Sequence, residues 1–554
     1  MKTTAKLFAL ILAVLMVFGV FAGCDNSATP STAPSTAPSQ KPQESDNPET
    51  EDPSPELPLT DTVKEVSVWQ AFAASTITSI NESSYVDYVE EATNIRLKFH
   101  ETSTAEATVN FNLMISSQDY PDIIRPGNEG IYPGGGDKAI EDGVYLELTD
   151  LINDYIPNYA AIRNKGGEYA KLTISDNGNI WSIWSIKDPA EPAWTGMGIR
   201  KDLLDSYGMA LPVTIADWEE CLTAFRDNGV KYPLLMNQSG VMTNHEFISA
   251  WGLGSAVTAG KEMYNVNGEA RFGYIQPEFK DYLETMNRWY ADGLIDPNFT
   301  GRGITFSVAG AGEAATETNL GNVGALPTNW GFSANRRAAA GLTEIADMWI
   351  AAVKAPVLNE GDEVQFRYTN YVTAVPNCIS TGCDDPALVA RLFNFWFSEE
   401  GSRMMNYGKE GVSYTMENGA PRYADIIMND PDGFVARDAS LRHVWDDGIG
   451  YIDYTRLWQP FEITAPDALL AYDVWGSDGC DYVMPPVSLS TEEGAEYSSI
   501  MSDIRTICDE SITKFIMGTK PLDEFDAFVA QVNSMNIARA IEIQQTALDR
   551  YNAR

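Results

Sequence analysis

The sequence predicts an α/β fold with more than one lobe, and three observations support this. Strand-like and helix-like segments alternate between Glu65 and Ile124, an order that is typical of parallel βαβ units. The chain has 554 residues, which is more than a single hydrophobic core usually supports. Hydrophobic residues make up 44% of it, so a substantial core can form. We therefore expect at least two α/β lobes.

The first lobe is expected to begin with alternating strands and helices. Apolar side chains alternate with polar ones in the strand segments and recur at helical spacing in the others. The expected order is a strand at 65–69, a helix through 85–95, a strand at 95–99, a helix at 107–117 and a strand at 120–124. Ligands of open α/β sheets bind outside the carboxyl ends of the strands. Trp69 and the loop around Asp122 are therefore expected near a cleft.

Three later helices carry clear end signals. Pro277 opens a helix through residue 290 whose apolar side chains form one stripe. Asp385 is a suitable N-cap for a helix through Trp396. Thr214, with Asp217 three positions later, predicts a capping box at the start of a third helix.

The N-terminus has the pattern of an export signal. Basic residues precede an apolar run from Leu7 to Ala22, an order that is typical of a secretory signal peptide. The run is shorter than the roughly 20 apolar residues that a membrane-spanning helix needs. The residues up to Cys24 resemble the bacterial lipobox, although Phe21 stands where leucine is usual. We predict a signal peptide at 1–23 and lipidation of Cys24.

The segment after this cysteine is predicted to be a linker. Residues 25–60 contain eight of the 29 prolines and no aromatic residue, so they cannot bury enough apolar surface to offset the entropy of ordering. A proline-rich chain extends by about 3.1 Å per residue, which gives a reach of at most roughly 110 Å. We assign 24–60 to the lipidated cysteine and a disordered tether.

Charge and rare residues exclude several classes of site. The formal net charge of −40 disfavours nucleic acid and anionic membrane surfaces as partners. Three histidines and the absence of a CxxC pair leave little material for a zinc site or a histidine-based triad, and we predict no metal and no cofactor. Cys378 and Cys383 could close a small disulfide loop in an oxidising exterior or remain buried free thiols.

Five further segments carry a more specific pattern, in a fixed order from about residue 65 to 430. They are SSQDYPDIIRP with IEDGVYLELTDLINDYIPNY, WTGMGIRKDLLDSYGMALPVTIADWEECLTAFRDN, YADGLIDPNF, NVGALPTNWGF, and FSEEGSRMMNYGKEGVSYTMENGAPRY. Together they resemble the extracellular solute-binding proteins of bacterial ABC importers. The resemblance is to the sugar-binding class related to maltose-binding protein, and especially to its large lipoprotein branch in Gram-positive bacteria.

This resemblance implies a periplasmic-binding-protein-like fold of type II, in which several strands cross between two lobes and solute closes the cleft by hinge motion. Lobe 1 is expected to comprise 61–190 and 355–415, and lobe 2 to comprise 191–354 and 416–554. The chain is expected to cross between them at 181–194, between about 351 and 371, and near 410–419.

The resemblance also implies aromatic side chains at the solute site, since sugars stack on ring faces. The 13 tryptophans and 25 tyrosines are generous for packing alone. Trp330, preceded by Asn329, stands where this family positions a stacking ring. Asp122 could accept sugar hydroxyls or shape its loop. Four further tryptophans could serve the solute or the core: Trp69, Trp184, Trp194 and Trp475.

The function implied is capture of a carbohydrate, in particular an oligosaccharide, and its delivery to the permease of an ABC transporter. The protein would be a monomer, tethered by lipid to the outer face of the cell membrane. A binder of peptides or another non-sugar solute is the alternative, and a surface glycoside hydrolase is a weaker one. With 78 acidic residues, paired carboxylates must occur somewhere and cannot identify a hydrolase. We therefore expect no enzyme activity.

Overall fold

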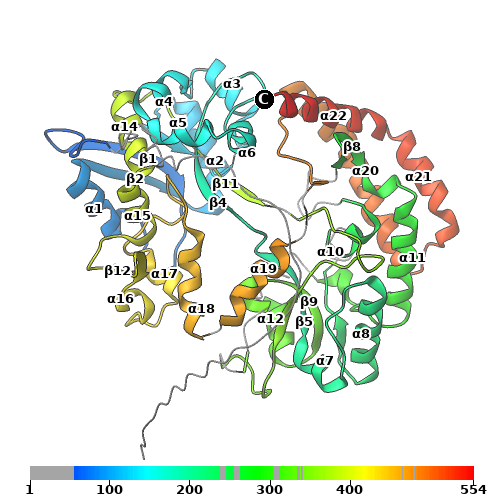
Figure 1. Ribbon diagram of the computed structural model, residues 1–554. Coiled ribbons are helices and arrows are strands. Elements are labelled where there is room, and N and C mark those ends of the chain that lie inside the picture. Colours follow the sequence, from blue (N-terminus) through cyan, green and yellow to red (C-terminus); the bar gives the residue numbers. More distant parts are fainter. Residues whose placement is uncertain are drawn as a thin grey trace, which may run out of the picture. The chain divides into compact units, whose positions relative to one another are not determined.

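The structure is a computed structural model that describes residues 55–128, 130–237, 245–254, 263–302, 312–333, 337–338, 341–367, 369–464, 466–477, 479 and 481–554. The chain divides into two units, Met1–Asp52 and Pro53–Arg554, of which the structure describes only the second, from residue 55 on. The predicted signal peptide, Cys24 and most of the linker lie outside the described residues. The second unit contains two larger sheets, each covered by helices (Figure 1).

The first of these sheets has five strands in the order β2-β1-β3-β11-β4. Strand β1 pairs in parallel with β2 and β3, which confirms the predicted βαβ units. Strand β11 runs antiparallel to β3 and β4 and joins the sheet from much later in the chain. The strands are β1 (Lys64–Ala71), β2 (Ile95–Thr102), β3 (Ile123–Arg125), β4 (Ile183–Glu191) and β11 (Asn370–Ile379).

Ten helices and a small hairpin accompany the first sheet among the described residues. The helices are α1 (Ser84–Thr93), α2 (Ala107–Ser117), α3 (Gly135–Glu141), α4 (Thr149–Tyr155), α5 (Pro157–Arg163), α6 (Gly167–Leu172), α14 (Pro386–Trp396), α15 (Glu399–Tyr407), α16 (Asp425–Met428) and α17 (Ala436–Ser440). The hairpin consists of β12 (Tyr414–Glu417) and β13 (Ala420–Tyr423). Asp385 caps α14 as predicted, since its carboxylate accepts a hydrogen bond from the Leu388 N–H.

The second sheet has four strands in the order β10-β5-β9-β6. They are β5 (Thr195–Arg200), β6 (Tyr232–Leu234), β9 (Val323–Asn329) and β10 (Ile350–Val353), with a separate hairpin of β7 (Met263–Val266) and β8 (Glu269–Phe272). The accompanying helices are α7 (Lys201–Tyr207), α8 (Ile215–Asp227), α10 (His245–Ile248), α11 (Glu278–Ala291), α12 (Gly312–Asn319) and α13 (Trp330–Ser333). The predicted capping box of Thr214 and Asp217 opens α8.

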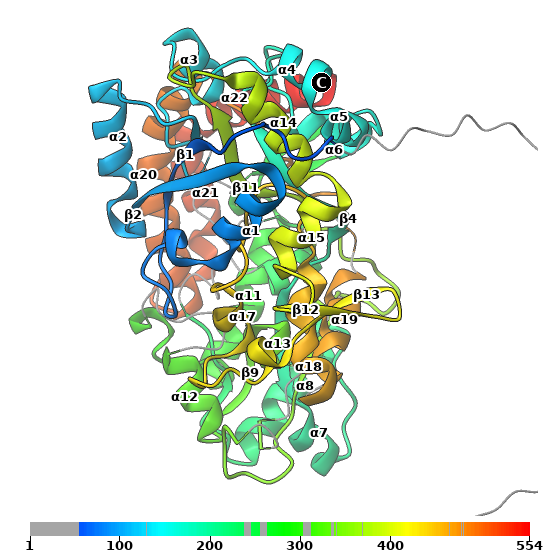
Figure 2. The same cartoon turned by 90° about the vertical axis from the view of Figure 1, so that its left-hand side faces the viewer.

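The C-terminal part of the chain is helical. It contains α18 (Gln459–Thr464), α19 (Leu470–Gly476), α20 (Thr491–Ile516), α21 (Phe525–Ser534) and α22 (Ile537–Ala553). The last three pack on α11 and the second sheet through one large apolar core. Figure 2 shows β1, β2 and α1 of the first lobe in the upper half and β9, α8 and α12 of the second lobe in the lower half, with α20, α21 and α22 also in the upper half. No helix within the described residues is both long and apolar enough to cross a membrane.

The chain first passes between the two larger sheets from β4, which ends at Glu191, to β5, which begins at Thr195. The second crossing is later than the expected boundary at 355. Phe366 still packs in the second core, so the chain returns to the first lobe only as it enters β11.

The third crossing is also later than expected, so the boundary at 416 is wrong. Trp445 and Ile452 pack in the core of the first lobe. The hairpin that follows residue 410 turns back toward α15, where Tyr414 and Tyr423 lie 5.8 and 5.2 Å from the Tyr407 ring. The segment therefore stays in the first lobe through Ile452.

The buried cysteines resolve an alternative that the sequence left open. Cys378 and Cys383 are both free and buried, so they do not close a disulfide loop. Burial raises the pKa of the Cys383 thiol to about 12, which keeps it protonated and unreactive at neutral pH.

Candidate functional site

A cavity of about 1650 Å³ lies between the two lobes. The first lobe contributes α3 and residues near Trp181 and Trp184. The crossing segment contributes residues 369–374, and the second lobe contributes 483–492 and the end of α22. Typical small-molecule pockets occupy about 300–1,000 Å³. The cavity is therefore large enough for a solute of several linked units.

Three aromatic side chains of the first lobe form what we call the cavity wall: Tyr132, Trp181 and Trp184. The ring centroids of Trp181 and Trp184 lie 5.5 Å apart at an interplanar angle of 80°. Behind them, Tyr145 stacks on Trp181 at 6.2 Å and 13°. The Trp184 backbone N–H donates to the Tyr159 hydroxyl at 3.1 Å. These contacts hold the rings in place before a solute arrives, which reduces the entropic cost of binding.

Gly136 in α3 allows Trp181 to take its position. A Cβ atom at Gly136 would lie 1.9 Å from the Trp181 ring, far inside van der Waals contact. The φ angle of Gly136 is not among the positive values of the chain. Glycine is therefore required at position 136 because the Trp181 ring lies so close to the backbone.

Polar groups next to the cavity wall are organised by the chain itself. The Asp137 carboxylate accepts hydrogen bonds of 2.8 Å from Ser175, Asn177 and Asn179, and this shapes the turn before β4. Arg367, on the second crossing, donates to the Thr195 carbonyl at 3.2 Å. A few fixed polar groups beside apolar rings are the usual composition of a site that binds a small molecule. No group of three or more His, Cys, Asp or Glu residues that could hold a metal ion occurs in the described ranges.

A second cavity of about 610 Å³ lies at the carboxyl ends of β1 and β3. Arg125 reaches it at 4% exposure, with its guanidinium 4.7 Å from the Trp445 ring centroid. The guanidinium donates to Gln70 and Asn377 at 2.7 Å and to the Asp447 carbonyl. Burial lowers the Arg125 pKa to about 10, so the group stays charged at neutral pH.

The two cavities are lined by adjacent residues of the chain at two places. Gly127 lines the smaller cavity and Asn128 the larger one, and Val375 and Ala374 are divided in the same way. The loop after β3 and the middle of β11 therefore border both cavities.

The predicted site residues of the first lobe have different surroundings. Trp184 lines the larger cavity. Trp69 lies inside the first lobe at 7% exposure, 5.7 Å from the Phe111 ring, and lines neither cavity. The Asp122 carboxylate accepts hydrogen bonds from the Ser67 N–H at 2.8 Å and from its hydroxyl at 2.6 Å. These contacts tie β3 to β1 and give Asp122 a structural role.

Trp330 and Asn329 lie at the end of β9, away from both cavities. The Trp330 ring packs 4.6 Å from Phe461 and 5.4 Å from Tyr472. The Asn329 side chain accepts a hydrogen bond from the Phe332 N–H at 2.9 Å and so helps to start α13.

The two remaining tryptophans also lie outside these cavities. Trp475 is fully buried in α19, and its indole N–H donates to the Met197 and Val353 carbonyls at 3.3 and 3.1 Å. We call Trp330, Phe461, Tyr472 and Trp475 the crossing cluster, because they pack beside the first crossing. Trp194 is 41% exposed on that crossing.

Sequence reasoning missed two residues of the cavity wall and the C-terminal lining. Trp181 stands three positions before Trp184 in the predicted crossing segment, and the glycines at 134–136 signal a close approach of the backbone. Both features could have identified Trp181 as a residue of the cavity wall. Nothing in the sequence indicates that residues 548–554 reach the cavity, because they are separated from its other lining residues by long stretches of chain.

Comparison with known proteins supports the predicted resemblance. No protein-family model matches the chain. The fructooligosaccharide ABC transporter substrate-binding protein FusA of Streptococcus pneumoniae is 26% identical over 236 residues, which cover 39% of this chain and 42% of that protein. Lipoprotein LipO of Bacillus subtilis is 25% identical over 229 residues, covering 40% and 42%. The matched region thus spans less than half the length of either relative.

The solved structures agree over most of the chain. An HMO-binding, ABC-transporter-associated solute-binding protein from Bifidobacterium longum infantis superimposes with a TM-score of 0.71 at 16% identity, covering 89% of this chain and 99% of that one. The chain therefore has the two-lobed fold of solute-binding proteins, as the sequence predicts.

Proposed function

We propose that this protein is the solute-binding component of an ABC importer, that it captures an oligosaccharide between its lobes, and that it delivers this solute to a membrane permease. FusA and the similar structure support this role, since their names describe the binding of a substrate or solute and not catalysis. Solute entering the cavity would contact both lobes and favour their closure by hinge motion.

The observation that carries the proposal is the cavity wall of Tyr132, Trp181 and Trp184 beside a large cavity lined by both lobes. Aromatic rings offer flat apolar faces to the CH groups of a sugar, while neighbouring polar groups pair with its hydroxyls. The volume of about 1650 Å³ favours several linked sugars over one.

Binding measurements test the choice of solute. A glycan array followed by calorimetry should find an oligosaccharide that binds, and labelled oligosaccharide should be recovered uncleaved. Trp181→Ala should lower its affinity by roughly 1 to 3 kcal/mol, the amount expected for a lost stacking ring. Trp194→Ala is the matched control and should leave affinity unchanged, since Trp194 lines neither cavity. No response to sugars together with binding of peptides would favour the peptide alternative.

The proposal includes a lipid tether at Cys24 on the outer face of the cell membrane. Two acyl chains on one cysteine give durable attachment, because buried CH₂ groups contribute about 0.8 kcal/mol each. Cys24→Ala should move the protein from the membrane fraction to the medium without a change in solute affinity. A loss of solute binding in this variant would mean that the cysteine serves the fold instead.

A further inference from the structure

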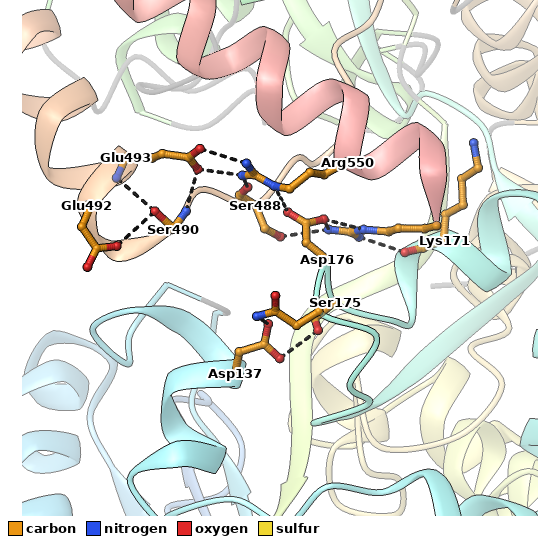
Figure 3. A network of polar contacts seen from close by, with 11 residues as sticks. Asp137, Lys171, Ser175, Asp176, Ser488, Ser490, Glu492, Glu493 and Arg550 are labelled. Carbon is orange, nitrogen blue, oxygen red and sulfur yellow. Dashed lines mark hydrogen bonds and ion pairs between the residues drawn. The ribbon is translucent and has the colours of Figure 1, made fainter.

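The C-terminal end of α22 contacts the first lobe through a cluster of charged side chains (Figure 3). The Asp176 carboxylate accepts a hydrogen bond from Nε of Arg550 at 2.9 Å. It also accepts hydrogen bonds from Nε and Nη2 of Arg554 at 2.9 and 2.6 Å. Asp176 follows α6 in the first lobe, whereas α22 packs in the core of the second. One carboxylate of the first lobe therefore pairs with two arginines of the second.

Neighbouring contacts extend this junction. The Tyr551 hydroxyl donates to Glu168 at 2.7 Å, and Nη1 of Arg554 donates to the Lys171 carbonyl at 2.9 Å. Both acceptors belong to α6. The last turn of α22 and the residue after it, Arg554, thus contact α6 and the turn that follows α6.

The junction closes one side of the larger cavity, since Asp176, Arg550 and Arg554 are also among its lining residues. Figure 1 shows this end of α22 beside α6, away from β5 and α19, where the chain crosses between the lobes. The lobes are joined covalently at the crossings and only by noncovalent contacts at α22.

Arg550 is held in position by contacts within its own lobe. Arg550 also donates from Nη1 and Nη2 to Glu493 at 2.9 and 2.7 Å, and this pair lies between α20 and α22 of the second lobe. It therefore persists if the lobes separate, while Asp176 loses both arginines. The side chains of Asp176 and Arg554 are only 11% and 6% exposed, so their attraction is stronger than that of a pair on the open surface.

We propose that Asp176, Arg550 and Arg554 form an electrostatic latch that favours the closed arrangement of the lobes. The latch itself does not depend on the identity of the solute. Its consequence for affinity rests on the proposed function: a protein that spends more time closed binds its solute more tightly, because less binding energy is spent on closure.

Solution scattering of the solute-free full-length chain tests the latch directly. The radius of gyration of the wild type should increase between about 50 mM and 1 M NaCl, because salt screens the three charges. Asp176→Asn keeps the size of the side chain but removes its charge, and should give the larger radius already at low salt. Equal radii for both proteins at all salt concentrations would overturn the proposal.

A matched control separates the latch from general effects of charge. Glu496 in α20 and Arg539 in α22 form a bidentate pair at 3.0 and 2.9 Å. Both residues belong to the second lobe, so this pair does not connect the lobes. Glu496→Gln should therefore behave as the wild type in scattering. Hydrogen exchange gives a second reading: residues 168–176 should exchange faster in Asp176→Asn than in Glu496→Gln. Equal exchange in the two variants would also contradict the latch.

Affinity measurements distinguish a failed latch from a failed function. With an oligosaccharide identified by the array, Asp176→Asn should weaken binding about threefold to tenfold, and Glu496→Gln should not. Scattering and exchange changes without any sugar binding would leave the latch in place and reject the proposed solute. Unchanged affinity in Asp176→Asn would show that the contact does not couple to binding and would overturn its proposed consequence.

Discussion

The cavity wall and the crossing cluster are built from the same residue types but differ in what covers their rings. Trp181 and Trp184 line a cavity and are supported from behind by Tyr145 and Tyr159. Trp475 is fully buried, and a Cβ at Gly196 would lie 2.4 Å from its indole nitrogen. An aromatic ring can bind a solute only if one of its faces remains uncovered. The comparison shows that tertiary packing places the rings of the cavity wall beside open space, whereas no ring of the crossing cluster lines either cavity.

The largest expected effect is loss of stability in the crossing cluster. Trp475→Ala should lower the free energy of unfolding by about 3 to 5 kcal/mol, as expected for a large side chain removed from a filled core, and it also leaves two carbonyls without their donor. Urea unfolding measures this change. Trp194→Ala, at an exposed tryptophan nearby, should cost far less. A small loss for Trp475 would mean that the crossing cluster is as open as the cavity wall.

A smaller effect, on solute affinity, is expected at Gly136, whose backbone packs against the Trp181 ring of the cavity wall. Gly136→Ala should displace the Trp181 ring, because the new methyl group would lie 1.9 Å from it. Solute affinity should fall by roughly 1 to 3 kcal/mol, as for removal of the ring itself. Gly494→Ala is the control in the same cavity, since the nearest atom to its added Cβ is at 3.9 Å. Equal solute affinities of these two variants would show that Trp181 does not contact the solute.

The smallest effect on binding is expected at Trp330, which the sequence favoured as the stacking platform. Trp330→Ala should lower the free energy of unfolding by about 1 kcal/mol through the lost contacts with Phe461 and Tyr472. Calorimetry with the identified sugar should find its affinity nearly unchanged. A clear loss of affinity in a stable variant would instead place the crossing cluster at the solute site. The crossing cluster and the cavity wall would then both bind the solute.

Elements fixed by local interactions could be predicted from the sequence. The capping box of Thr214 and Asp217 and the N-cap at Asp385 formed as predicted, because a cap needs only residues within one helical turn. The parallel pairing of β1 with β2 and β3 also followed from the order of strands and helices. Such features depend on neighbours in the sequence, which are visible without a structure.

Features that depend on distant partners were less predictable. The hairpin after residue 410 returns to α15, and Trp445 joins the first core, although the sequence suggested a crossing there. Short apolar stretches can complete the core of either lobe equally well, since hydrophobic burial has no direction. Only the assembled structure decides which lobe receives them.

The α/β class, the presence of more than one lobe and the resemblance to solute-binding proteins could be predicted from the sequence, which also predicts an export and lipidation signal at the N-terminus. The tertiary structure alone decided which aromatic rings reach the cavity and that Asp176 meets Arg550 and Arg554 across the lobes. The physical reason is that composition and periodicity record which side chains avoid water. They do not record which face of a ring stays uncovered once all the distant segments have packed.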